Sequence, residues 1–309
     1  MFKNILYATT LSSDCEDTSY FAFDLARRYG ATLHIFHIFG TPTHGFSPYA
    51  ISTSTGEKVD YYGDYSGWIV EELKNTFAEQ IHKYSKCKIQ TIAGLPHVEI
   101  LRKAKKEDID LIVMSCHLPH GDIDTTHCQN VMGITMKKLA QKSRCPIIIV
   151  NQPVRKKFEN FSQIIFGVDF TRTSISAFKY ALKLAQTNNG TLHLFHVVEL
   201  DSPGKAGELS DSEMDKKIEE ANRKIEQMFL PLMNGYKNFL INIRIGTPHR
   251  EILNYTGEVR GDIIVMAHHI KKADEKKMVL GKTIEQVAIN SPCPVASINR
   301  SDKVQLMFE

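Results

Sequence analysis

A run of potential metal ligands is the densest concentration of reactive side chains in the sequence. Between positions 116 and 128 the chain holds two cysteines, three histidines and two aspartates. Thiolates and imidazoles together can ligate zinc. The spacing matches no standard zinc finger, and adjacent side chains such as Cys116 and His117 seldom reach one ion. We therefore expect a polar surface loop, with zinc as the alternative. The ligands of that alternative site are Cys116, His117, His120, His127 and Cys128.

Paired histidines recur on two predicted strands. His34 and His37 lie three residues apart in LHIFHIF, and His193 and His196 lie three residues apart in LHLFHVV. Successive side chains on a strand point to opposite faces, so residues three apart do not share a face. We therefore do not expect either pair to hold one ion or one substrate together.

The overall composition is that of an ordinary globular protein. Of the 309 residues, 42% are hydrophobic and 24% are charged, and 38 Lys and Arg stand against 35 Asp and Glu. The basic residues are scattered, whereas a nucleic-acid-binding protein concentrates them on one face. No stretch approaches the ~18 apolar residues of a membrane-spanning helix. We therefore expect neither nucleic acid nor a membrane among the partners.

The cysteines and the first residues both bear on the compartment. Six cysteines are spread over the chain without the spacing of a disulfide framework, so reduced thiols are expected. The first residues, MFKNILYATTLSSD, turn polar after about four apolar positions, too few for the apolar core of a signal peptide. Both features favour the cytoplasm.

An internal repeat organises the whole chain. In the most similar pair of segments, GLPHVEIL at 94–101 matches GTPHREIL at 246–253. Four further blocks match in the same order: 3–8 with 162–167, 32–38 with 191–197, 110–114 with 262–266, and 145–147 with 293–295. Chance does not produce five ordered blocks, so we infer duplication of a unit of about 150 residues.

The domain boundaries follow from the repeat. Repeat 1 is assigned to residues 1–152 and repeat 2 to residues 161–309, each long enough to close its own hydrophobic core. The linker between them is 153–160. Gln152-Pro153, at its start, and Arg155-Lys156-Lys157, within it, interrupt any regular element.

Each repeat alternates short apolar runs with longer amphipathic ones, which is typical of βαβ units and a parallel sheet. The predicted strands of repeat 1 are 3–9, 32–38, 88–93, 110–114 and 146–150, and its predicted helices are 17–29, 69–84, 98–105 and 133–141. The predicted strands of repeat 2 are 163–169, 191–197, 239–245, 262–266 and 294–298. Residues 41–67 form the longest stretch without a predicted element.

The order of these elements carries a family resemblance. A first strand, the LHIFHIF strand, a GxPxxEIL segment, the DLIVM strand, a helix opened by glycine and a final CPIIIV strand follow one another. Over nearly its whole length the chain resembles a tandem universal stress protein of the UspA-like superfamily. The resemblance implies an α/β fold with two Rossmann-like (adenine nucleotide alpha hydrolase-like) domains. Each would hold a five-stranded parallel sheet flanked by helices, and the domains would pair through their last strands.

Many members of that family bind ATP, and open α/β sheets place phosphates near helix N-termini at the carboxyl ends of the strands. The family loop after the fourth strand reads Gly-x-x-Gly, then nine residues, then Gly-Ser or Gly-Thr. Its glycines let backbone N–H groups approach the phosphates. Repeat 1 departs from this pattern, since Ser115 and Leu118 replace the glycine pair and Ile134 follows Gly133. Thr10 stands where nucleotide-binding relatives carry an acidic residue.

Repeat 2 keeps more of the pattern. Asp169 matches the acidic residue after the first strand, but Ala267 and Ile270 replace the glycine pair. The resemblance implies ATP or AMP as the candidate cofactor of this repeat. The residues expected at that site are Asp169, Ala267, His268, His269, Gly281, Lys282 and Thr283, with Gly133 at the matching place in repeat 1. The alternative is that Gly133 and Gly281 only open helices packed tightly on the sheet.

Three functional hypotheses remain at this point. No Ser–His–Asp order, paired-carboxylate motif or HExxH motif occurs, so we assign no catalytic residue. The first hypothesis is a non-enzymatic stress-response module that binds a small ligand or a protein partner and signals. The second is an adenine-nucleotide-binding protein, with slow ATP hydrolysis, that uses repeat 2. The third is a carrier of an apolar ligand, because Leu118 and Ile270 make both sites less polar. A homodimer of the chain is a further option.

Overall fold

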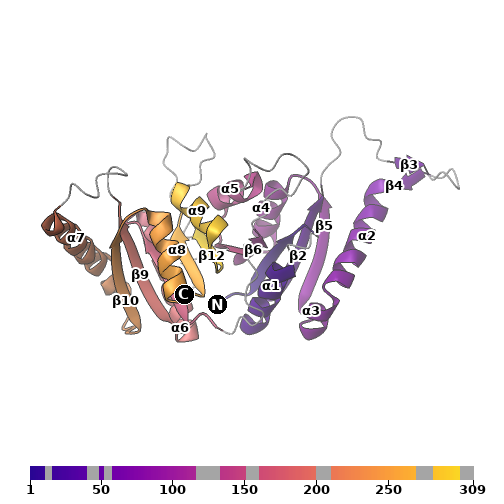
Figure 1. Ribbon diagram of the computed structural model, residues 1–309. Coiled ribbons are helices and arrows are strands. Elements are labelled where there is room, and N and C mark those ends of the chain that lie inside the picture. Colours follow the sequence, from indigo (N-terminus) through magenta and orange to yellow (C-terminus); the bar gives the residue numbers. More distant parts are fainter. Residues whose placement is uncertain are drawn as a thin grey trace. The chain divides into compact units, whose positions relative to one another are not determined.

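The computed structural model describes residues 1–10, 16–39, 49–51, 58–115, 133–150, 160–199, 210–268 and 281–299 (Figure 1). The chain divides into two compact units, Met1–Ser115 and Cys116–Glu309. We call them unit 1 and unit 2. Unit 1 holds most of repeat 1, whereas unit 2 holds the last helix and strand of repeat 1 together with repeat 2.

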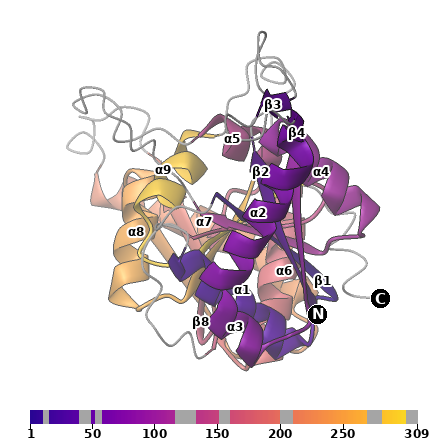
Figure 2. The ribbon, with the colours of Figure 1, turned by 90° about the vertical axis from the view of Figure 1, so that its right-hand side faces the viewer.

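Unit 1 is built on four parallel strands in the order β6-β1-β2-β5. The strands are β1 (Asn4–Thr9), β2 (Thr32–Phe39), β5 (Cys87–Ala93) and β6 (Leu111–Ser115). The helices are α1 (Glu16–Tyr29), α2 (Tyr61–Thr76), α3 (Ala78–Lys83) and α4 (Pro96–Lys106). Two short strands, β3 (Tyr49–Ile51) and β4 (Lys58–Asp60), pair antiparallel apart from this sheet. In Figure 2, α2 lies in front of the sheet, and it packs on β5.

Strands β1 and β6 of unit 1 are buried on both faces, which explains their composition. All five residues of β6 are buried, and Ile5, Leu6 and Tyr7 of β1 are fully buried. A parallel strand covered on both faces has no solvent side, so its sequence is a continuous apolar run rather than an alternating one. The positions of these strands could therefore be predicted to within a residue or two.

The prediction for residues 41–67 was wrong where the structure describes them. Residues 49–51 and 58–60 form the β3–β4 pair, and α2 begins at Tyr61, eight residues before the predicted helix start. Gly63 and Gly67 disfavour a helix by propensity. Buried Ile69 and Leu73 nevertheless anchor α2, and burial of such a face outweighs propensity.

Six described strands belong to unit 2, and they follow one another in the order β10-β9-β8-β11-β12-β7. The strands are β7 (Ile147–Val150), β8 (Gln163–Val168), β9 (Thr191–Val198), β10 (Phe239–Ile245), β11 (Ile263–Ala267) and β12 (Val295–Ile298). The helices are α5 (Ile134–Lys142), α6 (Arg172–Asn188), α7 (Asp211–Phe229), α8 (Pro248–Glu258) and α9 (Lys282–Asn290), with a 3-10 turn at Leu230–Leu232. The predicted α/β architecture with parallel strands is confirmed in both units.

The last strands of the two repeats pair with each other inside unit 2. Strand β12 runs antiparallel to β7, while the other strand pairs of this sheet are parallel. Residues 147–150 and 295–298 are all buried. The pairing of last strands that the family resemblance implied is therefore present.

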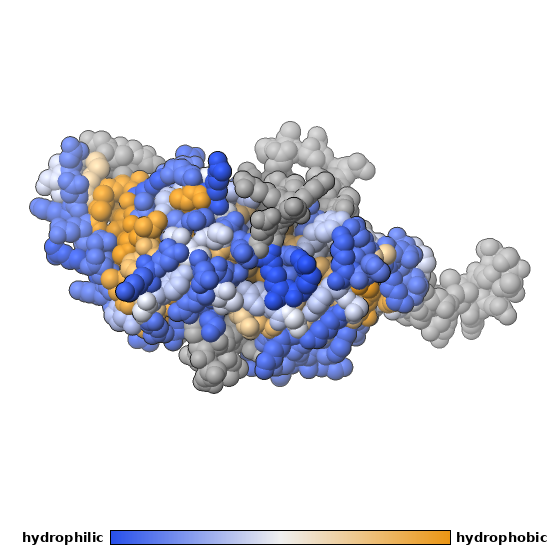
Figure 3. Space-filling model, turned by 90° about the horizontal axis from the view of Figure 1, so that it is seen from below, coloured by the Kyte–Doolittle hydropathy of each residue, from blue (hydrophilic) through white to orange (hydrophobic). Residues whose placement is uncertain are grey.

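The opposite edge of the unit 2 sheet is only half covered. Most residues of the edge strand β10 are half-buried, and Leu240 is 54% exposed. On the face shown in Figure 3 the residues are mostly hydrophilic, and the largest group of hydrophobic residues lies at the end of unit 2 that carries α7 and β10. No helix in the described ranges combines the length and the apolar character needed to cross a membrane.

In both repeats an aspartate carboxylate binds the backbone at the start of the first strand. The Oδ2 atom of Asp110 accepts hydrogen bonds from the backbone N–H groups of Lys3 (2.7 Å) and Asn4 (2.9 Å). The Oδ2 atom of Asp262 accepts the matching bonds from Ser162 and Gln163, each at 2.8 Å. Charge-assisted bonds of this kind are stronger than neutral ones. The repeat therefore extends from the sequence to individual hydrogen bonds.

Helix α6 has clear boundaries at both ends. The Thr171 hydroxyl accepts a hydrogen bond from the backbone N–H of Ser174 (3.3 Å), which caps the first turn. Asn189 ends the helix in the left-handed conformation (φ 50°). Gly190 then starts the return to β9. A Cβ atom there would overlap the carbonyl oxygen of Phe161 and lie 2.9 Å from Cδ1 of Ile164.

Gly190→Ala should therefore lower the free energy of unfolding by about 1–3 kcal/mol, because the backbone of Phe161 cannot move away cheaply. Chemical denaturation measures this change. The control is Gly257→Ala on the exposed side of α8, where no atom lies within 4 Å of an added Cβ. That change should stabilise the protein by about 0.5–1 kcal/mol. Equal effects of the two substitutions would contradict the close approach at Gly190.

Candidate functional site

The candidate site lies at the carboxyl ends of two neighbouring parallel strands of repeat 2. Strand β8 ends at Val168 and pairs with β11, which ends at Ala267. Open α/β sheets bind ligands outside the carboxyl ends of their strands. The chain also enters α9 after β11, so the topology brings the N-terminus of α9 to this end of the sheet.

Asp169, the predicted acidic site residue, is exposed, and its carboxylate is engaged within its own turn. Its Oδ1 atom accepts hydrogen bonds from the backbone N–H (3.0 Å) and the hydroxyl (2.8 Å) of Thr171. Between them Phe170 has a positive φ of 56°, which is uncommon for a bulky residue. Asp169 therefore shapes the connection from β8 into α6.

His196, on the neighbouring strand β9, contacts the same connection. Its Nδ1 atom lies 2.9 Å from the carbonyl oxygen of Val168, and its ring lies 4.5 Å from that of Phe170. Burial lowers the pKa of His196, which favours a neutral ring whose Nδ1–H donates to that carbonyl. His37 makes the same contact with the carbonyl oxygen of Thr9 (3.0 Å) in repeat 1. The second histidine of each pair thus has a structural role at a strand end.

The residues that follow β11 are enclosed. Ala267 is 9% exposed and His268 is 1% exposed. The backbone N–H of His268 donates to the carbonyl oxygen of Ile298 (2.8 Å), which extends the contact between β11 and β12. His269 and Ile270 lie outside the described residues.

The start of α9 is open to solvent. Gly281 precedes the helix, Lys282 is exposed and Thr283 is half-buried. Gly281 has φ −55° and ψ 135°, which any residue can adopt, and the nearest described atom to an added Cβ would be Cγ2 of Ile284 at 4.0 Å. Gly133 has nearly the same conformation before α5 (φ −58°, ψ 149°). Packing against the described residues therefore does not explain the glycine at 281.

The predicted metal ligands cannot be placed. All five predicted ligands, Cys116, His117, His120, His127 and Cys128, lie outside the described residues, as does Leu118. Within the described ranges no group of three or more His, Cys, Asp or Glu side chains could hold a metal ion. The zinc alternative thus stays a prediction.

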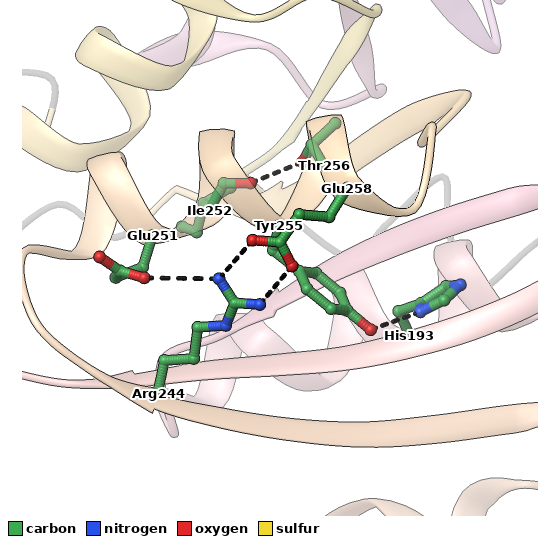
Figure 4. A network of polar contacts seen from close by, with 7 residues as sticks. All are labelled: His193, Arg244, Glu251, Ile252, Tyr255, Thr256 and Glu258. Atoms are coloured by element: carbon green, nitrogen blue, oxygen red, sulfur yellow. Dashed lines mark hydrogen bonds and ion pairs between the residues drawn. The ribbon is translucent and has the colours of Figure 1, made fainter.

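A polar network on α8 was not predicted from the sequence (Figure 4). The Tyr255 hydroxyl lies 2.8 Å from Nδ1 of His193, whose Nε2 lies 2.7 Å from Oε1 of Gln163. The Tyr255 ring stacks on Phe195, with centroids 4.4 Å apart. The Arg244 guanidinium lies 5.2 Å from the Tyr255 centroid, a cation–π distance.

Two glutamates of α8 complete this network. Nη1 of Arg244 donates to Oε1 of Glu258 (3.0 Å) and lies 3.6 Å from Oε2 of Glu251. Arg244 belongs to β10 and His193 to β9, so the network fixes α8 over the edge of the sheet. Periodicity could not reveal it, because the network joins side chains of α8 to side chains from three different strands, β8, β9 and β10.

The matching position of repeat 1 lacks this arrangement. His34 aligns with His193, and Lys103 stands where Tyr255 does. The His34 side chain is 1% exposed, and neither ring nitrogen has a hydrogen-bond partner among the described residues. Burial, reinforced by the positive charges of Lys103 and Lys88, lowers the pKa of His34 to about 4. Duplication therefore kept the histidine but not its partners.

Both repeats match the model of one known protein family. The model of the "Universal stress protein family" matches residues 1–151 and 160–298. Universal stress protein MJ0531 of Methanocaldococcus jannaschii is 25% identical over 173 residues, covering 54% of this chain and 99% of the relative. Universal stress protein MJ0577 of the same organism is 27% identical over 159 residues, covering 46% and 97%. Each relative thus corresponds to about half of this chain.

Two solved structures match over nearly the full length. A universal stress protein from Archaeoglobus fulgidus has a TM-score of 0.62 at 20% identity, covering 97% of each chain. The protein PA1789 from Pseudomonas aeruginosa, described as functionally unknown, has a TM-score of 0.60 at 13% identity, covering 99% of this chain and 95% of its own. At these identities the likeness concerns the fold alone.

Acid should destabilise the protein through His34. Its folded pKa of about 4 lies below the ordinary 6.5, so the unfolded chain takes up the proton first. The stability linked to His34 is fully present above pH 6.5 and is lost as the pH falls toward 4. The slope is at most about 1.4 kcal/mol per pH unit.

Unfolding in urea at several pH values measures this dependence for the parent and for His34→Leu. The substitution should flatten the slope between pH 6.5 and 4. His82→Leu, at an exposed position of the same unit, controls for the loss of an imidazole as such. If His34→Leu leaves the slope as steep as in the parent, the ring is not held neutral by burial.

Proposed function

Because the chain belongs to the universal stress protein family, we propose that it is a non-catalytic stress-response module that binds a small ligand or a protein partner. The proposed binding site lies at the carboxyl ends of β8 and β11 and includes Asp169 and the start of α9. The proposal keeps the cytoplasmic location expected from the sequence.

The observation that carries this proposal is the engagement of the Asp169 carboxylate. One of its oxygens already accepts two hydrogen bonds from Thr171, at 3.0 and 2.8 Å. A carboxylate that orders its own turn is less available to a metal ion or a reacting group. At the end of the neighbouring strand β11, Ala267 stands where nucleotide-binding relatives have a glycine, whose missing Cβ admits a phosphate. These residues favour binding over catalysis.

The proposal also assigns the family domains to residues 1–152 and 161–309, with 153–160 as the linker. In this arrangement each repeat supplies one domain, and the last strands hold the repeats together within one chain. The antiparallel register of β7 and β12 supports this arrangement.

A second candidate, binding of ATP or AMP by repeat 2, is favoured by one observation. Gly281 is exposed at the N-terminus of α9, and neither its backbone conformation nor the packing of described atoms requires glycine there. A phosphate that approaches the free N–H groups of the helix would require it. Slow ATP hydrolysis would belong to this candidate only.

Titration with ATP and magnesium in a calorimeter separates the two candidates. Under the first proposal no binding heat appears at millimolar ATP. Micromolar binding that Asp169→Ala abolishes would replace it by the nucleotide-binding candidate. Asp211→Ala, at an exposed position in the first turn of α7, is the matched control for removing a carboxylate.

Native mass spectrometry of protein isolated from cells tests the binding role itself without assuming a ligand. We expect a fraction of the protein to carry a small molecule or a second protein. A population that is entirely free of both would contradict the binding role.

A further inference from the structure

The last strands of the two repeats pair in a locally twofold-symmetric way. The sequence aligns 147, 148 and 149 with 295, 296 and 297, because Cys145-Pro146 matches Cys293-Pro294. In the structure Ile148 pairs with Ala296, its own counterpart, while Ile149 pairs with Val295 and Ile147 with Ser297. A pairing centred on equivalent positions is what two copies of one unit form when they associate symmetrically.

The two strands are not equal in volume. Repeat 1 contributes three isoleucines, and repeat 2 contributes Val295, Ala296 and Ser297, all of them at most 2% exposed. Each cross-strand pair therefore joins a large side chain to a smaller one. Directly opposite side chains lie close together, so three isoleucines against three isoleucines would crowd the site. The three small residues against themselves would leave a void.

The two repeats also carry opposite charges at one pair of equivalent positions on their last helices. Lys137 of α5 and Glu285 of α9 are equivalent positions, each four residues after the glycine that precedes its helix. Their side chains lie 2.7 Å apart and are only 21% and 17% exposed. Two copies of repeat 1 would bring lysine against lysine at this place, and two copies of repeat 2 would bring glutamate against glutamate. Like charges in such a place repel each other.

We propose that these residues make the pairing surface heterotypic, so that each repeat selects the other repeat and rejects a second copy of itself. The partner that fits the last strand and helix of repeat 1 is therefore the last strand and helix of repeat 2. Selectivity comes both from favourable contacts in the mixed pair and from unfavourable ones in the like pairs. The hydrogen bond from the side-chain amide of Asn299 to the carbonyl oxygen of Gln141 does not add to this selectivity, because repeat 1 also has asparagine, Asn151, at the equivalent position.

Exchange of the surfaces in the full-length chain tests this proposal. The first variant, V295I/A296I/S297I/E285K, gives repeat 2 the surface of repeat 1. The second variant, I147V/I148A/I149S/K137E, gives repeat 1 the surface of repeat 2. The third variant carries all eight substitutions, so that each repeat has the surface of the other and the pairing is again between unlike surfaces. Unfolding in urea compares two mixed pairings with two like pairings.

We expect each like pairing to raise the unfolding equilibrium constant at a given urea concentration by at least about tenfold, with most of the loss of stability recovered in the eightfold variant. If the eightfold variant is as unstable as the two losses combined, the pairing is not selective and the proposal is wrong.

A milder series covers the case in which the larger exchanges prevent folding. Lys137→Glu and Glu285→Lys each place like charges across the pair, and K137E/E285K reverses it. The double variant should be more stable than either single variant at low salt, and this advantage should shrink at high salt. Strictly additive losses would overturn the electrostatic part, and with it the claim that charge and volume act together.

Discussion

The antiparallel contact between β7 and β12 is the interaction on which the organisation of unit 2 depends. An edge strand of a sheet leaves a row of backbone N–H and C=O groups without partners. Strand β11 covers one side of β12, and β7 pairs with the other side. Both β7 and β12 are buried throughout. The contact brings α5 and β7 of repeat 1 into the same compact unit as repeat 2. In a chain with two repeats, the backbone groups at this strand edge thus find hydrogen-bond partners within the same chain, whereas a single repeat would need a second molecule.

The ligand end of repeat 2 shows how a duplicated scaffold can keep its form while its side chains change partners. The turn after β8 is held by the Asp169 carboxylate and by the His196 ring, each bonded to an atom of the protein. The glycine before α9 has no such explanation among the described residues. Two opposing features therefore lie at one site: a carboxylate that already has partners within its turn, and a glycine that the described part of the fold does not require. The proposed binding role without catalysis follows from the first, and the nucleotide alternative from the second.

The sequence predicted the repeat and the parallel strands because these depend on patterns that burial imposes, whereas the pairing of last strands was implied by the family resemblance alone. Strands such as β6 and β11 are buried along their whole length and must be apolar throughout. The start of α2 was missed because its glycines disfavour a helix and only tertiary contacts compensate for them. The different environments of His34 and His193 were missed because each depends on a side chain from another element, Lys103 or Tyr255. Equivalent positions in a repeat therefore predict the same backbone but not the same partners.

Amide hydrogen exchange in β7, measured by mass spectrometry on the full-length chain, tests the central claim most directly. If β7 and β12 are paired, peptides covering 147–150 and 295–298 should exchange slowly and with similar protection, far more slowly than the half-exposed edge strand β10. Fast exchange of residues 147–150, comparable to that of β10, would mean that the last strands do not pair, and the account of two mutually selective repeats would be contradicted.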